Sequence, residues 1–125
     1  MAEDISAAHH KLLRAIPILP SLDLARTLDF CTSKLGMKEA GRYDDYLVVQ
    51  RDGVRLHFWF CEDRKLPENT SCYFIVEGIE ALFEELSGRA VEFRYPLRLQ
   101  PYGMKEFMVI DPDGNAIRFG SIAEN

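Results

Sequence analysis

Apolar residues recur along this chain with two spacings, one typical of helices and one typical of strands. Helical spacing appears twice, over about 24–35 and about 78–87, and a glycine follows each stretch. Ser21 or Asp23 stands where a residue that caps the first helix is expected. The pattern therefore predicts two amphipathic helices, one in each half of the chain.

Short apolar runs outside the helices predict strands. These runs cover about residues 15–19, 37–43, 46–51 and 54–61 in the first half, and 72–76, 91–95, 106–110 and 116–120 in the second. Pro17 has no N–H to donate, so the first strand should have one unpaired side. Asp52 and Gly53 predict a tight hairpin turn. The two prolines of residues 96–103 (PLRLQPYG) favour a loop.

The order strand, helix, three strands occurs twice, and the two halves are weakly similar in sequence. LDLARTL at 22–28 aligns with VEGIEAL at 76–82, and RDGVRLHF at 51–58 aligns with DPDGNAIRF at 111–119. One half of this size buries too little apolar surface to fold alone. The two halves are therefore expected to pack together.

The expected fold class is α+β. An N-terminal arm over residues 1–14 precedes a single domain over 15–125, which contains two βαβββ halves, about 15–61 and about 71–121. Two half-sheets related by a pseudo-twofold axis would form a curved mixed sheet with the helices outside. The concave inner face of such a sheet is a place where a small molecule can bind.

Composition places the chain among folded proteins that do not bind nucleic acid. Hydrophobic residues make up 47% of the chain and charged residues 28%. The net charge of −5 disfavours nucleic acid, whose phosphates need a basic surface, and would suit a cationic ligand. No apolar run is long enough to cross a membrane, and the acidic N-terminus lacks the apolar stretch of a signal peptide. Three cysteines without paired spacing favour reduced thiols and a cytoplasmic location.

Several short motifs occur in the order found in one superfamily. LPSLD at 19–23 and LGM at 35–37 flank the first helix, and QPYG at 100–103, EF at 106–107 and DPDGN at 111–115 lie near the end. Together with the repeated strand order, they make most of residues 15–120 resemble the vicinal oxygen chelate superfamily. This superfamily includes glyoxalase I, extradiol dioxygenases and bleomycin-resistance proteins, and the resemblance is closest to the last group.

The resemblance implies a metal position to which each of four strands contributes one residue. In this chain the four positions hold Ile16, His57, Ser71 and Arg118. Ile16 has no donor atom, Ser71 is a poor neutral ligand, and Arg118 carries a permanent positive charge. Because one histidine does not make a metal site, we expect no metal, no cofactor and no metal-dependent catalysis.

The resemblance also implies a ligand groove on the concave face. Resistance proteins place aromatic residues at the positions of Tyr46 and Tyr102, and one member has a tryptophan at that of Tyr73. Strand alternation puts Trp59 on the same face as His57. Such a surface suits a flat heteroaromatic ligand, which can stack on the rings. For each of these aromatic residues, the alternative is ordinary packing.

Charged residues near this groove have two interpretations. Asp44, Asp45 and Glu68 match acidic positions of the family and would attract a cationic ligand, or they are ordinary solvated loop charges. His57 either contacts the ligand or is a half-buried polar residue of its strand. Arg118 either binds an anionic group or forms a salt bridge.

These observations predict a non-catalytic homodimer that binds and sequesters a flat, cationic antibiotic of the bleomycin type. Two grooves would lie at the dimer interface, because family members exchange the first strand between subunits. Gly41 and Tyr102 stand where some resistance proteins carry phenylalanine and tryptophan, so a different small molecule is an alternative ligand. The alternative from another class is a superfamily enzyme, glyoxalase-like or dioxygenase-like.

Overall fold

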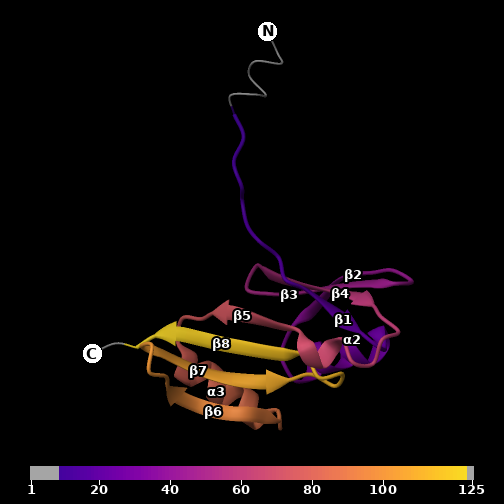
Figure 1. Cartoon of the computed structure of the whole chain (residues 1–125). Helices are drawn as coiled ribbons and strands as arrows, with labels where there is room; N and C mark the ends of the chain where they lie inside the picture. The colour runs from indigo at the N-terminus through magenta and orange to yellow at the C-terminus, as the bar shows by residue number, and fades with distance from the viewer. Residues whose placement is uncertain (1–8, 124–125) are drawn as a thin grey trace.

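Each half of the chain forms its own four-stranded sheet, and one helix packs on each sheet (Figure 1). The computed structural model describes residues 9–123. The first half contains β1 (Ile18–Ser21), α2 (Leu24–Ser33), β2 (Lys38–Arg42), β3 (Tyr46–Arg51) and β4 (Val54–Phe60). After a short 3-10 helix, η1 (Pro67–Asn69), the second half contains β5 (Ser71–Ile75), α3 (Ile79–Gly88), β6 (Phe93–Leu99), β7 (Met104–Ile110) and β8 (Ala116–Ile122). The predicted α+β class is confirmed.

The two sheets have the same strand order, which confirms the predicted duplication. The order is β1-β4-β3-β2 in the first sheet and β5-β8-β7-β6 in the second. In each half the first strand pairs in parallel with the last strand, whereas the other neighbours are antiparallel. Within residues 9–123, β1 and β5 therefore each have one edge that pairs with no strand.

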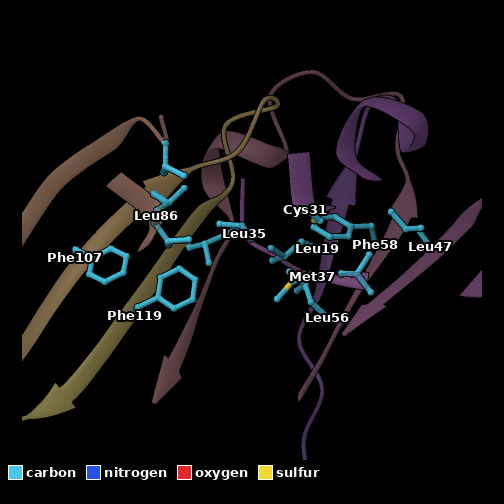
Figure 2. Close-up of a cluster of buried hydrophobic side chains, with 14 of the residues drawn as sticks. Leu19, Cys31, Leu35, Met37, Leu47, Leu56, Phe58, Leu86, Phe107 and Phe119 are labelled. Atoms are coloured by element: carbon cyan, nitrogen blue, oxygen red, sulfur yellow. The ribbon is translucent and has the colours of Figure 1, made fainter. Parts of the chain in front are cut away.

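One hydrophobic core joins the two halves. α2 and the residues after it contribute Cys31 and Leu35 to this core, and α3 contributes Ile79 and Leu86. Figure 2 shows Leu35 between the buried side chains of the first half and those of the second, which include Phe119. Burying one side chain of this size contributes about 1.5–3 kcal/mol. A half without its partner would expose this shared surface, so the two are expected to fold together.

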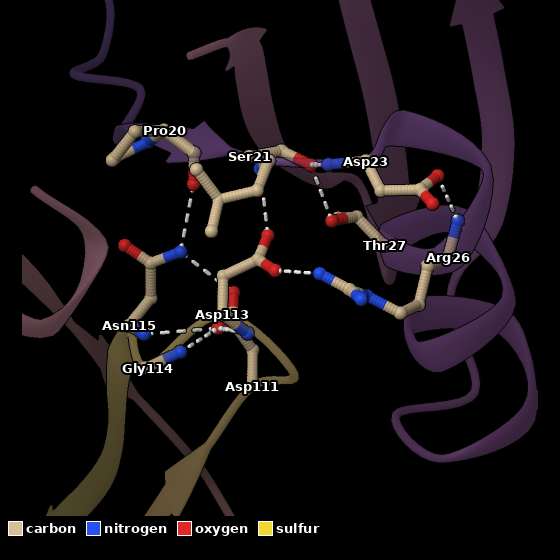
Figure 3. Close-up of polar contacts among 10 residues, drawn as sticks. Pro20, Ser21, Asp23, Arg26, Thr27, Asp111, Asp113, Gly114 and Asn115 are labelled. Carbon is tan, nitrogen blue, oxygen red and sulfur yellow. Dashed lines mark hydrogen bonds and ion pairs between the residues drawn. The ribbon is translucent and has the colours of Figure 1, made fainter. Parts of the chain in front are cut away.

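The DPDGN turn binds the second half to the first (Figure 3). Asp111 Oδ1 accepts three backbone N–H groups of the turn, at 2.9, 3.0 and 2.9 Å. The side-chain amide of Asn115 donates to the Pro20 carbonyl at 2.8 Å, and Asp113 forms an ion pair with Arg26 of α2. Burial raises the pKa of Asp111, although hydrogen bonds from the turn oppose that effect. This motif, which carries part of the family resemblance, therefore has a structural role.

The first strand begins later than the sequence pattern indicates. It starts at Ile18 and not at residue 15, so Pro17 lies just before it and Pro20 lies within it. Proline is compatible with β1 because this strand lies at the edge of its sheet. The expectation of one unpaired side is therefore confirmed for the described residues, although Pro20 and not Pro17 is the proline inside the strand.

The predicted loop over 96–103 is wrong in its first half. β6 continues through Pro96 to Leu99, and only residues 100–103 form the turn to β7. Pro96 is tolerated because β6 is an edge strand whose pairing with β7 is irregular between Tyr95 and Arg98. Pro96 therefore marks an edge strand and not a loop.

Residues 9–17 extend away from both sheets before they enter β1 (Figure 1). Leu12 and Leu13 in this segment are 99% and 73% exposed. The rest of the predicted arm, residues 1–8, lies outside the described residues. Neither α2 nor α3 has the length and hydropathy that a membrane-spanning helix needs.

Candidate functional site

Side-chain alternation gives each sheet one face that packs on its helix and one face turned away from it. The core side of β4 and β5 holds Leu56, Phe58, Cys72 and Phe74. The other side of the same strands holds Arg55, His57 and Trp59 in β4, and Ser71, Tyr73 and Ile75 in β5. The alternation expected for both strands is therefore confirmed.

Two faces, one on each sheet, are turned away from the helices. The N-terminal open face consists of Tyr46, Val48, Arg55, His57 and Trp59. The C-terminal open face consists of Tyr73, Ile75, Tyr95, Glu106, Met108, Arg118 and Gly120.

A phenol, an imidazole and an indole meet on the N-terminal open face. The Tyr46 hydroxyl and His57 Nδ1 are hydrogen-bonded at 2.8 Å, with the two rings edge to face at 5.4 Å. Tyr46 lies opposite Trp59 in the β3–β4 ladder, and Trp59 is 39% exposed. Nε2 of His57 is buried and has no hydrogen-bond partner within residues 9–123. This face can therefore offer ring surface to a ligand, while Nε2 of His57 lies covered beneath it.

Asp44 and Asp45 lie at the border of this face, in the turn that leads into β3. Both are exposed, and the backbone carbonyl of Asp45 accepts the N–H of Phe60 at 2.9 Å. This backbone bond fixes the turn beside Tyr46. The two carboxylates can therefore attract a cation without forming part of the core.

Three tyrosines surround one carboxylate on the C-terminal open face. Glu106 has no exposed surface. Tyr73 and Tyr102 donate hydrogen bonds to its Oε1 at 3.1 and 2.5 Å, and Tyr95 donates to its Oε2. The donors come from β5, from β6 and from the turn at 100–103, so this contact joins three segments to β7.

The hydrogen bonds set the charge state of the cluster. Burial acts to raise the pKa of Glu106, but the three phenols and the positive charge of Arg118 outweigh burial and lower the pKa. Burial and the hydrogen bond to Glu106 raise the pKa of Tyr73 and Tyr95 to about 12. At neutral pH, Glu106 is therefore an ionised acceptor and both phenols remain protonated donors.

Arg118 and Glu68 occupy different surroundings. Arg118 lies opposite Tyr73 in the β5–β8 ladder and is exposed. It forms none of the ion pairs found within residues 9–123, so the salt bridge that the sequence left open is not observed there. Glu68 belongs to η1, and a Cβ at Gly114 would lie 3.2 Å from its Cα. Glu68 therefore packs against the DPDGN turn.

The donor set at the four family positions does not fit a metal. Ile16 lies just before β1, Ser71 begins β5, and Arg118 lies on an open face with His57 on the other. Within residues 9–123, no three residues among histidine, cysteine, aspartate and glutamate are grouped so that they could hold a metal ion. The correspondence of these four positions to metal ligands stays a prediction from the resemblance.

A cavity of about 480 Å³ lies elsewhere, on the helix side of the molecule. It opens between α3, the end of β5 and the turn from β3 to β4, and none of the nine predicted ligand residues lines it. Five of the nine lie on the open faces, namely Tyr46, His57 and Trp59 on the N-terminal one and Tyr73 and Arg118 on the C-terminal one. The other four lie outside them: Asp44 and Asp45 in the turn before β3, Tyr102 in the turn before β7, and Glu68 in η1.

Sequence reasoning misses Glu106, Tyr95 and Gly120. The one available signal is a glutamate at the start of the apolar run EFMVI. A charged residue inside a strand usually indicates a solvent-facing position, and here that interpretation is wrong because Glu106 is buried.

Comparisons with known proteins agree with one another. Residues 9–119 match the family model described as the Glyoxalase/Bleomycin resistance protein/Dioxygenase superfamily. Curated relatives from Geobacillus stearothermophilus and Staphylococcus aureus, each named bleomycin resistance protein, are 28% identical over 128 residues, with 86% of this chain and 96% of the relative covered. A solved structure of the bleomycin-binding protein from bleomycin-producing Streptomyces verticillus, complexed with copper(II)-bleomycin, is 32% identical with a TM-score of 0.82. That match covers 93% of this chain and 100% of the other.

Proposed function

This chain belongs to the glyoxalase/bleomycin resistance protein/dioxygenase superfamily, and we propose that it binds and sequesters a flat, cationic antibiotic of the bleomycin type. The observation that carries this proposal is the similarity, over almost the whole chain, to the Streptomyces verticillus protein solved with copper(II)-bleomycin. The open faces supply aromatic rings for stacking, and nearby carboxylates supply negative charge. Antibiotic resistance in the cytoplasm is the corresponding biological role.

The proposed contacts follow the nine residues expected from the sequence. The rings that would stack on the ligand are those of Tyr46, Trp59, Tyr73 and Tyr102. The carboxylates that would attract its cationic part are those of Asp44, Asp45 and Glu68. His57 would contact the ligand through the part of its side chain that is exposed, and Arg118 would contact an anionic group.

Binding without catalysis is the second part of the proposal. Nδ1 of His57 bonds the Tyr46 phenol and not the carboxylate that orients the histidine of a nucleophile–histidine–carboxylate triad. The set Ile16, Ser71 and Arg118 offers no suitable metal ligands. Any metal that the antibiotic carries would belong to the ligand. Stoichiometric zinc, nickel, manganese or iron in the purified protein, with a lower Tm after chelation, would instead favour a superfamily enzyme.

The edges of the two sheets and the extended N-terminal segment bear on how the chain assembles. We propose a twofold dimer in which residues up to about 20 of one copy reach the other, so that two equivalent grooves form between subunits. Exposed Leu12 and Leu13 in the extended segment support this arrangement, as do the unpaired edges of β1 and β5 within residues 9–123. Sedimentation should give a dimer, and a monomer at every concentration would contradict the assembly.

A binding titration tests the function. Purified protein is titrated with copper-loaded bleomycin and with metal-free bleomycin, and the fluorescence of Trp59, the single tryptophan, is followed. Saturable quenching by either form is expected, with one ligand per subunit. No change in Trp59 fluorescence and no calorimetric heat with either form would show that the ligand is a different molecule.

A further inference from the structure

The tyrosine cluster has a geometry that its separate residues do not explain. Tyr73, Tyr95 and Tyr102 approach Glu106 from three different segments, and each phenol donates to the same carboxylate. Two of these residues are exposed, Tyr73 at 37% and Tyr102 at 63%, whereas Tyr95 is only partly exposed. The carboxylate therefore holds the polar end of each ring while part of the ring surface stays open to a ligand.

Gly120 makes room for one of these rings. A Cβ at position 120 would overlap the Tyr73 hydroxyl and lie 2.6 Å from Cζ, closer than real Cβ contacts allow. Tyr73 stands on β5, beside β8, and Glu106 stands on β7, on the far side of β8. The phenol therefore crosses β8 directly above Gly120 to reach Glu106. With any larger residue at 120, this ring could not lie in the same position.

A cation covers the third ring. Cζ of Arg98 lies 4.0 Å from the ring centroid of Tyr95, which is a cation–π contact. This contact takes up one face of Tyr95, which is only partly exposed. The rings of Tyr73 and Tyr102 therefore present more surface to a ligand than that of Tyr95.

We propose that Glu106 is a positioning residue that fixes Tyr73 and Tyr102 as a stacking surface for the flat part of the ligand, with Gly120 as the residue that admits Tyr73. This inference rests on the proposed function. Rings that are already fixed lose little conformational freedom when a ligand binds, so a given stacking contact yields more affinity. Glu106 itself would not touch the ligand, because its side chain is fully covered.

The experiment compares Glu106→Gln with Glu84→Gln. Both variants remove one negative charge, but Glu84 is an exposed residue of α3 on the helix side. A glutamine amide keeps the size of Glu106 while one of its two acceptors becomes a donor, so the phenols lose part of their anchor. With copper(II)-bleomycin as probe, Glu106→Gln should weaken binding about tenfold or more. Glu84→Gln should change it less than about twofold.

The salt dependence of binding distinguishes a positioning role of Glu106 from direct attraction between its charge and the ligand. If Glu106 fixes the rings, the loss caused by Glu106→Gln persists at high salt. If Glu106 attracts the cationic part of the ligand directly, the loss shrinks as salt screens the charge, and the proposal is overturned. Equal binding by Glu106→Gln and the wild type at low salt would also overturn it.

A spectroscopic titration of the tyrosines tests the cluster without any ligand. Wild-type Tyr73 and Tyr95 should ionise near pH 12, and in Glu106→Gln they should ionise earlier. An unchanged tyrosinate titration overturns the inference even if bleomycin binds. If the wild type does not bind bleomycin but the titration shifts as expected, the proposed function fails and the fixed ring cluster stands.

If Glu106→Gln does not fold, Tyr102→Phe replaces it in the same measurements. This variant removes one of the three hydrogen bonds to Glu106 from an exposed turn.

Discussion

The two open faces have equivalent backbones but different chemistry. Tyr46 lies opposite Trp59 in the β3–β4 ladder, and the equivalent pair in the β7–β8 ladder is Glu106 and Gly120. The repeat therefore places a large aromatic residue on one face where it places glycine on the other.

This difference changes how each surface is built. On the N-terminal open face, Trp59 occupies the position above its own strand. On the C-terminal open face, Gly120 leaves that position empty, and Tyr73 from the neighbouring strand fills it and binds Glu106. The first surface contains one hydrogen-bonded pair, Tyr46 and His57, whereas in the second three phenols share one carboxylate. Outside the Tyr46–His57 pair, substitutions on the first should therefore have more nearly additive effects than those on the second.

The largest expected effect on stability comes from adding a side chain at Gly120. Gly120→Ala should lower the free energy of unfolding by about 1–3 kcal/mol, because the new methyl group overlaps the phenol of Tyr73. Urea unfolding measures this cost. Gly88→Ala is the matched control, since a Cβ at Gly88 meets nothing within 4 Å. Equal stability of the two variants would show that Tyr73 moves aside freely.

The next effect concerns affinity more than stability. Tyr102→Ala should cost about 1–3 kcal/mol of ligand binding, as interface aromatics often do. It should cost under about 1 kcal/mol of stability, the usual range outside a core, because Tyr102 is 63% exposed in its turn. Isothermal titration calorimetry measures the loss of binding free energy, and thermal unfolding measures the loss of stability. A variant that unfolds, with a residual folded fraction that still binds normally, would place Tyr102 in the core and remove it from the site.

The features that could be predicted from the sequence are local. Alternation along residues 54–60 and 71–75 correctly predicts which side chains leave the core, because a strand has a fixed side-chain period. Asp52 and Gly53 have φ values of 53° and 77°, as a tight hairpin turn requires. Tyr46 and His57 lie in adjacent strands of that hairpin, so its register brings them together.

The features that could not be predicted depend on distant contacts. Glu106 is covered by residues that lie 33, 11 and 4 positions away along the chain. No local pattern shows that three phenols will satisfy its charge. The sequence favours a loop at Pro96 because it does not tell which strands lie at the edges of a sheet. Gly120 looks like an ordinary strand terminus until the position of Tyr73 is known.

A weaker effect should be a pH dependence of the free energy of unfolding, which arises from the Glu106 cluster on the C-terminal open face. The pKa of Glu106 is lowered in the fold, so its contribution to stability is present at neutral pH and is lost as pH falls through the folded pKa. The pKa of Tyr73 is raised from 10.0 to about 12, so its contribution is complete below pH 10 and is lost as pH rises toward 12. Unfolding free energies of the wild type and Glu106→Gln across pH should show shallower slopes on both sides in the variant. Identical slopes would mean that the cluster does not couple to folding.

The smallest effect should come from the exposed carboxylates beside the N-terminal open face. Asp44→Asn combined with Asp45→Asn should weaken binding of copper(II)-bleomycin by under about 1 kcal/mol at low salt, because exposed charges interact weakly and are screened. The deficit should disappear at high salt. Stability should not change, since both residues are exposed.

Asp29→Asn combined with Glu84→Gln is the control, because it removes the same charge from exposed positions on α2 and α3. If the control weakens binding as much, the net charge of the protein attracts the ligand, and Asp44 and Asp45 have no special place. If only the Asp44 and Asp45 variant responds to salt, while the deficit of Glu106→Gln does not, the two faces contribute in different ways. The N-terminal open face would then act through separate charges and the C-terminal open face through fixed rings.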